Sequence, residues 1–121
     1  MNCSALYVPL PQHKLGDRWS GILAVGPWLI NDAAPAANLS RVKCQFKKDN
    51  ETFTFDSEAG ADALLTITDP ATWEATFPEL NNFLPSIGIW KFDIEFYETG
   101  FTSPLTLAYG EVEVIQDITP N

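Results

Sequence analysis

The sequence has few of the residues from which active sites are usually built. Among its 121 residues there is one histidine, His13, and there are two cysteines, Cys3 and Cys44. Two cysteines outline no recognisable disulfide framework, although a bond between them stays open, and no C-x-x-C pair is present. The G-x-S-x-G, Walker A and H-E-x-x-H motifs are also missing. We therefore expect no catalytic residue, no cofactor and no metal site, and we predict that the protein is not an enzyme.

Basic residues are scarce as well. Seven Lys and Arg residues stand against sixteen Asp and Glu residues, which gives a net charge of −9. Six of the basic residues lie within 1–48, while 49–121 holds Lys91 and fourteen acids. These two regions are expected to pair within one fold; the alternative is a dipolar surface that orients neighbours in an assembly. Nucleic acid is not an expected partner, because binding to phosphates requires a basic face.

Long hydrophobic runs are absent too. No run approaches the roughly twenty apolar residues that are needed to cross a bilayer. The N-terminal residues lack a basic stretch followed by an apolar core, so no signal peptide is expected. We therefore expect no membrane partner, and a protein that stays in the cytoplasm until it is assembled.

Alternation of apolar and polar residues is what the sequence does contain, most clearly within 89–115. Trp90, Phe92, Ile94 and Phe96 alternate with polar residues or tyrosine, and the run that ends at residue 115 repeats the pattern. A period of two places these two sets of side chains on opposite faces of a strand. Two half-buried strands joined by a polar turn predict an antiparallel hairpin, whose bulky apolar face needs a second layer to cover it.

Shorter runs between turn signals predict further strands. They are expected at 5–9, 18–30 with a break at Gly26-Pro27, 39–48, 52–55, 63–68 and 73–77, with a loop at 31–38 and a connector at 78–88. Residues 1–17 then form a lead-in edge segment and residues 117–121 a tail. Seven or eight short strands predict one all-β domain over 1–121, an antiparallel immunoglobulin-like β-sandwich. A small closed barrel is the alternative.

Two side chains that often take part in catalysis are expected to have plain structural roles. His13 lies in the lead-in segment, where we expect a solvated surface imidazole. Cys44 falls on the apolar side of the 39–48 strand, so we expect a small buried hydrophobe.

Charged residues on the predicted strands have two interpretations. Asp93 and Glu95 share one face of a strand, and such carboxylates can build a site for a divalent ion. Arg41, Lys43 and Lys47 line the exposed face of another strand. If the two strands are neighbours, cross-strand ion pairs explain both sets, and this is the preferred interpretation.

Aromatic residues give the candidate surface for interactions. Trp73 lies in an alternating register and is expected in the core. Trp28 and Tyr97 could offer exposed rings to a sugar, although packing at the core or an edge is preferred. The edge strand at 5–9 and the loop with Trp28 are candidates for contacts between chains. The predicted interaction surface is therefore Tyr7, Trp28 and Tyr97.

Four segments of the sequence form a recognisable series: V-K-C-Q-F-K (42–47), A-L-L-T-I-T-D-P-A-T-W (63–73), G-I-W-K-F-D-I-E-F (88–96) and L-A-Y-G-E-V-E-V (107–114). This series resembles small β-sandwich proteins of tailed phages and prophages, including the N-terminal domain of phage upper baseplate proteins. In that family a polar-basic strand precedes a strand of the G-x-Y/W-x-Y/F-D-L/I-E kind, and a G-x-V-x-V strand closes. The resemblance covers about 39–119, and the first forty residues do not map onto it.

This resemblance implies a virion structural protein, associated with a tail or baseplate, that acts through protein contacts and has no catalytic residues. Its implied partners are other virion or prophage proteins and itself, as a homo-oligomer, and its implied final location is the virion. The alternative function is a carbohydrate-binding module that uses exposed aromatic residues.

Overall fold

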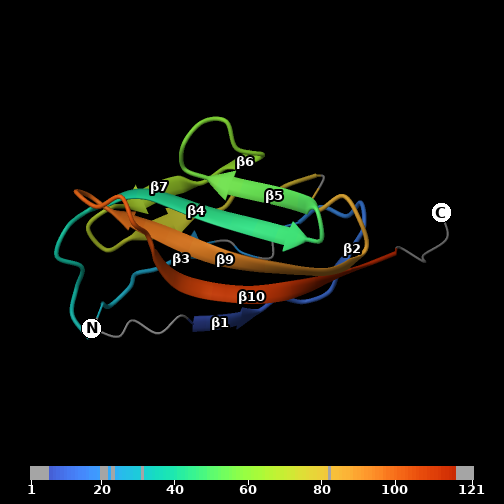
Figure 1. Cartoon of the computed structure of the whole chain (residues 1–121), viewed down its shortest axis with the longest axis horizontal. Helices are drawn as coiled ribbons and strands as arrows, with labels where there is room; N and C mark the ends of the chain where they lie inside the picture. The colour runs from blue at the N-terminus through green and yellow to red at the C-terminus, as the bar shows by residue number, and fades with distance from the viewer. Residues whose placement is uncertain (1–5, 20–21, 23, 31, 82, 117–121) are drawn as a thin grey trace.

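The computed structural model describes residues 6–19, 22, 24–30, 32–81 and 83–116. Within these ranges the chain is all-β, with ten strands and no helix. The strands form two sheets (Figure 1). The large sheet has the order β1-β10-β9-β4-β5-β6, with β2 also paired to β10, and the small sheet has the order β3-β8-β7. The coarse prediction of a sandwich-like all-β fold is therefore confirmed.

The strands differ greatly in length. Three long strands, β4, β9 and β10, form the centre of the large sheet, and the others are short. Their bounds are β1 Leu6–Pro9, β2 His13–Lys14, β3 Ala24–Val25, β4 Leu39–Lys48, β5 Glu51–Asp56, β6 Ala63–Leu64, β7 Thr66–Asp69, β8 Glu74–Thr76, β9 Gly88–Glu98 and β10 Leu105–Ile115.

The predicted C-terminal hairpin is confirmed as β9 and β10, which pair antiparallel with Trp90 opposite Val112. The four alternating apolar residues of β9 face inward: Trp90 and Phe96 are fully buried, and Phe92 and Ile94 nearly so, while Ile89 is exposed. Burial of one such side chain stabilises the fold by about 1.5–3 kcal/mol, so this alternation is a strong determinant of the sheet's inner face.

Two expectations about the sheets are wrong. The large sheet is mixed, because β1 and β2 run parallel to β10, and β6 runs parallel to β5, whereas the small sheet is antiparallel. β1 and β2 lie far from β10 in the chain, and the loop 57–62 between β5 and β6 is longer than a two-residue hairpin turn, so no tight turn forces these neighbours to be antiparallel. The closed barrel is also wrong, since β1 and β6 lie at opposite edges of the large sheet.

Short segments connect the two sheets. The predicted strand 63–68 is divided at Leu65: β6 pairs with β5 in the large sheet, and β7 pairs with β8 in the small one. The predicted strand 18–30 is reduced to β3 within the described residues, because the chain turns at Gly26. A Cβ at Gly26 would lie 2.6 Å from the carbonyl oxygen of Trp73, so only glycine fits there.

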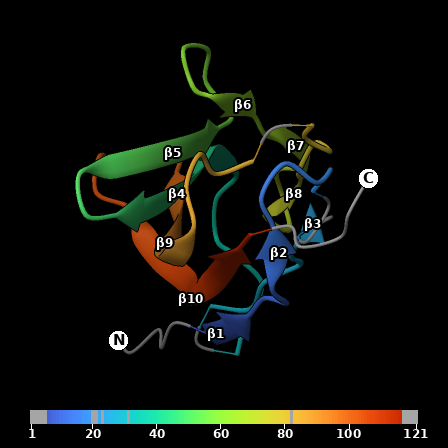
Figure 2. The ribbon, with the colours of Figure 1, turned by 90° about the vertical axis from the view of Figure 1, so that its right-hand side faces the viewer.

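Figure 2 shows the large sheet curving opposite the small sheet of β3, β7 and β8. The buried residues of both sheets and of the connecting segments form one core that is rich in aromatic rings. Trp19 stacks on Phe83 with a centroid distance of 4.0 Å, and Phe46 and Phe55 surround this pair. Trp73, as predicted, is buried at 1% exposure. It lies just before β8 rather than inside a strand, with a φ of 61°. Among the described residues, no helix could serve as a membrane span.

Candidate functional site

The three residues predicted as an interaction surface do not form one cluster. Tyr7 in β1 and Tyr97 in β9 lie on the outer face of the large sheet, each next to residues that point into the core. Trp28 lies on the inner side, where its ring is edge-on to Phe96 at 5.3 Å. The structure therefore offers two separate surfaces, an outer face and a groove between the sheets.

The outer face has an exposed aromatic pair. Tyr7 is directly opposite Tyr109 of β10, and their ring centroids are 5.4 Å apart. Tyr7 is 48% exposed and Tyr109 is 45% exposed. The same row continues across the sheet to Asp93 in β9 and Gln45 in β4. The rings thus stand beside side chains that donate and accept hydrogen bonds.

A shallow polar depression of about 500 Å³ adjoins this pair. The depression lies over β4, β9 and β10, and its lining includes the residues Gln45, Lys47, Asp49, Lys91, Asp93, Glu95 and Tyr109. Both signs of charge are present, so the depression can bind a neutral polar ligand without a strong preference for an ion. We call it the outer-face depression.

Tyr97 is not among the lining residues of this depression and packs instead against Arg41. The Arg41 guanidinium carbon lies 5.2 Å from the centroid of the Tyr97 ring, a cation–π geometry. Arg41 also donates two hydrogen bonds to Asp56, of 2.6 and 3.0 Å, and it contacts Glu58 at 3.1 Å. Tyr97 therefore has a packing role in this cluster.

The Arg41–Asp56 pair also shows where the ion-pair prediction differs from the structure. The prediction that these two strands are neighbours is confirmed: β4 pairs with β9, and Lys43 lies opposite Glu95. The ion pairs of Arg41, however, are made with β5 and the residues after it. Burial favours the neutral form of Asp56, but its hydrogen bonds from Arg41 and the Glu58 backbone outweigh this, so the pKa of Asp56 is lowered.

The groove between the sheets is apolar. It has a volume of about 690 Å³ and lies between β1 and β3, with Val8, Val25, Trp28, Ile94 and Ala108 among its lining residues. The Trp28 Nε1 atom is inaccessible to solvent and has no hydrogen-bond partner among the described residues. No charged side chain is present in the lining, and most of the lining side chains are apolar.

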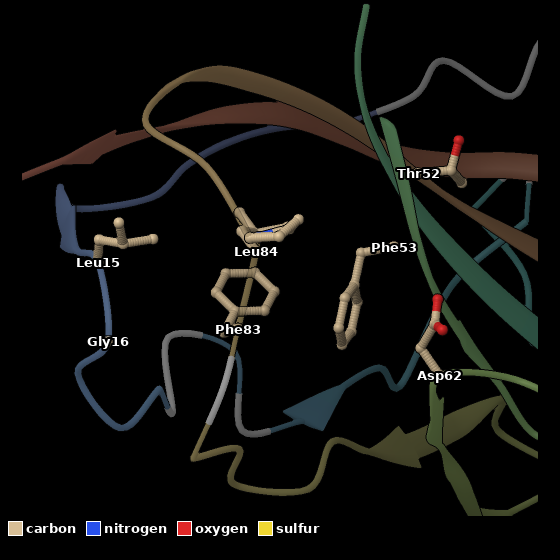
Figure 3. Close-up of a pocket in the computed structure, with 8 residues that line it drawn as sticks. Leu15, Gly16, Thr52, Phe53, Asp62, Phe83 and Leu84 are labelled. Atoms are coloured by element: carbon tan, nitrogen blue, oxygen red, sulfur yellow. The ribbon is translucent and has the colours of Figure 1, made fainter. Parts of the chain in front are cut away.

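A third pocket, of about 460 Å³, lies at the end of the sandwich near β5 (Figure 3). The rings of Phe53 and Phe83 lie at its centre, between Leu15 on one side and Asp62 on the other. The Asp62 carboxylate accepts a hydrogen bond of 2.7 Å from the backbone N–H of Thr54. This carboxylate therefore serves to close the loop after β5.

His13 is not on the surface, contrary to the prediction. It is 6% exposed, and its ring is edge-on to Phe83 with a centroid distance of 5.4 Å. The reason is its pairing with Val114, which turns the imidazole inward and Lys14 outward. Burial lowers the pKa of His13, and the charge of Asp17 opposes this shift.

Cys44 is buried with no exposed surface, as predicted. Burial raises the pKa of its thiol, which makes it a poor nucleophile. Cys3 lies outside the described residues, so the question of a bond between the two cysteines is untested. Within the described ranges, no three His, Cys, Asp or Glu residues are grouped in a way that could hold a metal ion.

Sequence reasoning missed Tyr109, although its alternation with Ala108 and Gly110 in the closing strand was a usable signal. It missed the burial of His13, for which the sequence had no local signal. Comparisons with known proteins add nothing to the geometry, because the chain matches no protein-family model, no curated protein and no solved structure.

Proposed function

We propose that this protein is a non-enzymatic structural module that acts through protein–protein assembly, of the kind found in phage or prophage tails and baseplates. The sandwich is immunoglobulin-like in this proposal. The order β10-β9-β4-β5 opposite β3-β8-β7 supports it. In the variable-type immunoglobulin arrangement, a sheet of strands G, F, C and C′ faces one that contains B, E and D.

The observation that carries the proposal is the outer edge of β1. No other described strand pairs with this edge, and two large side chains on it, Leu6 and Tyr7, are 58% and 48% exposed. An edge strand offers unpaired N–H and C=O groups to another strand, and natural proteins usually protect such edges with charged residues. The four residues of β1 include no charge.

A second copy is the simplest partner for this edge. Two β1 strands that pair around a twofold axis would join two large sheets into one. Both copies would then contribute the same surface, the edge of β1, to the interface. The exposed rings of Tyr7 and Tyr109 would lie beside the new junction and add apolar contact area. Other tail proteins can use the same edge when they supply the second strand.

Light scattering coupled to size-exclusion chromatography, over a range of protein concentrations, tests this proposal. We expect a concentration-dependent oligomer that Leu6→Lys dissociates, because the lysine places a charge on the pairing edge. Leu64→Lys is the matched control, since Leu64 is 57% exposed on β6 at the opposite edge of the same sheet. A strict monomer at high concentration, or equal effects of the two variants, would contradict self-assembly through β1.

The phage or prophage assignment has a separate test. Tail or baseplate genes on either side of the coding sequence would support it. A neighbourhood of unrelated metabolic genes would count against it, while the assembly role of β1 would still stand or fall on the scattering experiment.

The outer-face depression favours carbohydrate binding as a second candidate function. Tyr109 offers an exposed ring next to Gln45 and Asp93, which is the combination of stacking surface and hydrogen-bonding groups that a sugar requires. A glycan array tests it with Tyr109→Ala as the variant. Trp28→Phe is the control, because Trp28 lines the separate groove. The absence of binding across a broad array would dismiss this function.

A further inference from the structure

The segment that follows β1 is fastened across one end of the sandwich. We call residues 10–19 the strap. Its backbone is held at the end of β10, where β2 pairs with Val114 and Ile115 and the N–H of Leu15 donates to the carbonyl oxygen of Ile115 at 2.8 Å. It is held again at Leu80, with which Trp19 exchanges two hydrogen bonds of 2.8 and 3.0 Å. No further strand lies between Leu15 and Trp19, so the contacts of the strap's side chains add to these backbone bonds.

His13 is the buried polar side chain of the strap. It is 6% exposed, and its ring contacts Phe83 on the connector that precedes β9. Its Nε2 atom is inaccessible to solvent and has no hydrogen-bond partner among the described residues. A neutral imidazole tolerates such a site, whereas an imidazolium would place an additional N–H and a positive charge where neither is satisfied.

The charged groups near the strap do little to offset that cost. Lys14, Asp17 and Arg18 line the same surface depression as His13. Glu113 precedes Val114, the residue of β10 opposite His13, and Glu79 lies on the connector. Glu113 accepts a hydrogen bond of 2.6 Å from Gln12, and Glu79 is paired with Arg18 at 3.6 Å. Asp17 is exposed, and its charge favours the protonated imidazole only in part.

We propose that His13 makes the strap a proton-operated latch, which is closed while the imidazole is neutral and which opens when the imidazole is protonated. Opening separates β2 from the end of β10 and exposes the Phe83 ring and the end of the aromatic core. The unpaired ring nitrogen in the interface between the strap and the sheet carries this inference. It is independent of the assembly role of β1.

The pH range follows from the direction of the shift. The pKa of His13 is lowered in the closed state, whereas an imidazole in an opened strap has its ordinary value of about 6.5. The open state therefore binds more protons than the closed state between these two values. The closed strap is fully stable above about pH 6.5 and loses stability as the pH falls below it, until the pKa of the closed state is reached. In this interval, one proton changes the opening equilibrium by up to about tenfold per pH unit.

Nuclear magnetic resonance on untagged protein tests the latch directly, because His13 is the only histidine and its imidazole signal is unambiguous. We expect this signal to titrate below pH 6.5. We also expect the amides of Leu15 and Trp19 to lose hydrogen-exchange protection over the same range, after correction for the intrinsic exchange rate. Amides of the central strands β4 and β9 should keep their protection throughout.

Two variants separate the latch from general acid unfolding. His13→Leu replaces the imidazole with an apolar side chain that cannot be protonated, so the strap amides should stay protected at pH values where the wild-type strap opens. Asp17→Asn changes an exposed residue and removes the charge that favours protonation, so its opening midpoint should move to lower pH. If His13→Leu does not fold, the Asp17→Asn shift still decides the question. An imidazole that titrates at or above pH 6.5, or an opening midpoint that neither variant changes, would overturn the proposal.

Discussion

Replacement of Phe46 by alanine is the most direct test of the two-layer core. Phe46 in β4 has no exposed surface, and its ring lies within 4.7–6.2 Å, between centroids, of four other aromatic rings. Removal of a phenyl ring from such a site costs the transfer free energy of the ring and leaves a cavity. We expect a loss of about 3–5 kcal/mol, which is a large part of the roughly 5–15 kcal/mol that stabilises a domain.

Phe101→Ala is the control for this prediction. Phe101 is 58% exposed in the turn between β9 and β10, so its replacement should change stability by no more than about 0.5 kcal/mol. Urea unfolding followed by tryptophan fluorescence measures both variants. With a slope of about 1.5 kcal/mol per molar urea, Phe46→Ala should lower the midpoint by about 2–3 M. Equal midpoints for the two variants would refute a core between two facing sheets.

Three further predictions concern single residues outside that core test. Gly110→Ala should detach β1 and remove its amide protection, because a Cβ there would overlap the carbonyl oxygen of Val8. Asp56→Asn should be less stable than wild type at neutral pH. In the wild type, the lowered pKa of Asp56 stabilises the fold above about pH 4, and this stabilisation is lost as the pH falls through the folded-state pKa. The variant should lack this part of the pH dependence of its unfolding free energy, which unfolding at a series of pH values measures. Cys44 should resist thiol reagents until the protein unfolds, in a background without the N-terminal cysteine.

Alternation in the long strands could be predicted because it is a local signal. In β9, and in β4 and β10 beyond one register shift in each, a period of two fixes which side chains face inward, and the structure buries those residues. The core position of Trp73 followed from the same reasoning, even though its backbone is not in a strand. Each of these strands is long enough that one face collects several kcal/mol of apolar burial.

His13 and Arg41 show where local reasoning fails. Strand β2 has two residues, which is too short for a period, and the burial of His13 depends on Val114, about a hundred positions along the chain. Arg41 lies on β4, and both neighbouring strands, β5 and β9, carry acidic residues. The sequence does not say which of the two strands places a carboxylate within hydrogen-bonding distance of Arg41. The partner is Asp56 on β5 and not an acid on β9.

The candidate surfaces were predicted only as separate residues. Tyr7 was recognised from its edge strand, but its contact with Tyr109 exists because β1 runs parallel to β10, from opposite ends of the chain. Trp28 was recognised as a loop aromatic, and its position in an apolar groove is a consequence of how the two sheets face each other. No periodicity in the sequence encodes either relation.

The sequence by itself determined that the protein is all-β and which residues of its long strands are buried, because the pleat of a strand converts a period of two directly into two faces. The tertiary structure alone decided the parallel pairing at the edge, the passage from one sheet to the other at Leu65, and the burial of His13. These features depend on contacts between distant parts of the chain. Their energies are realised only when the whole sandwich has closed, so no local pattern carries them.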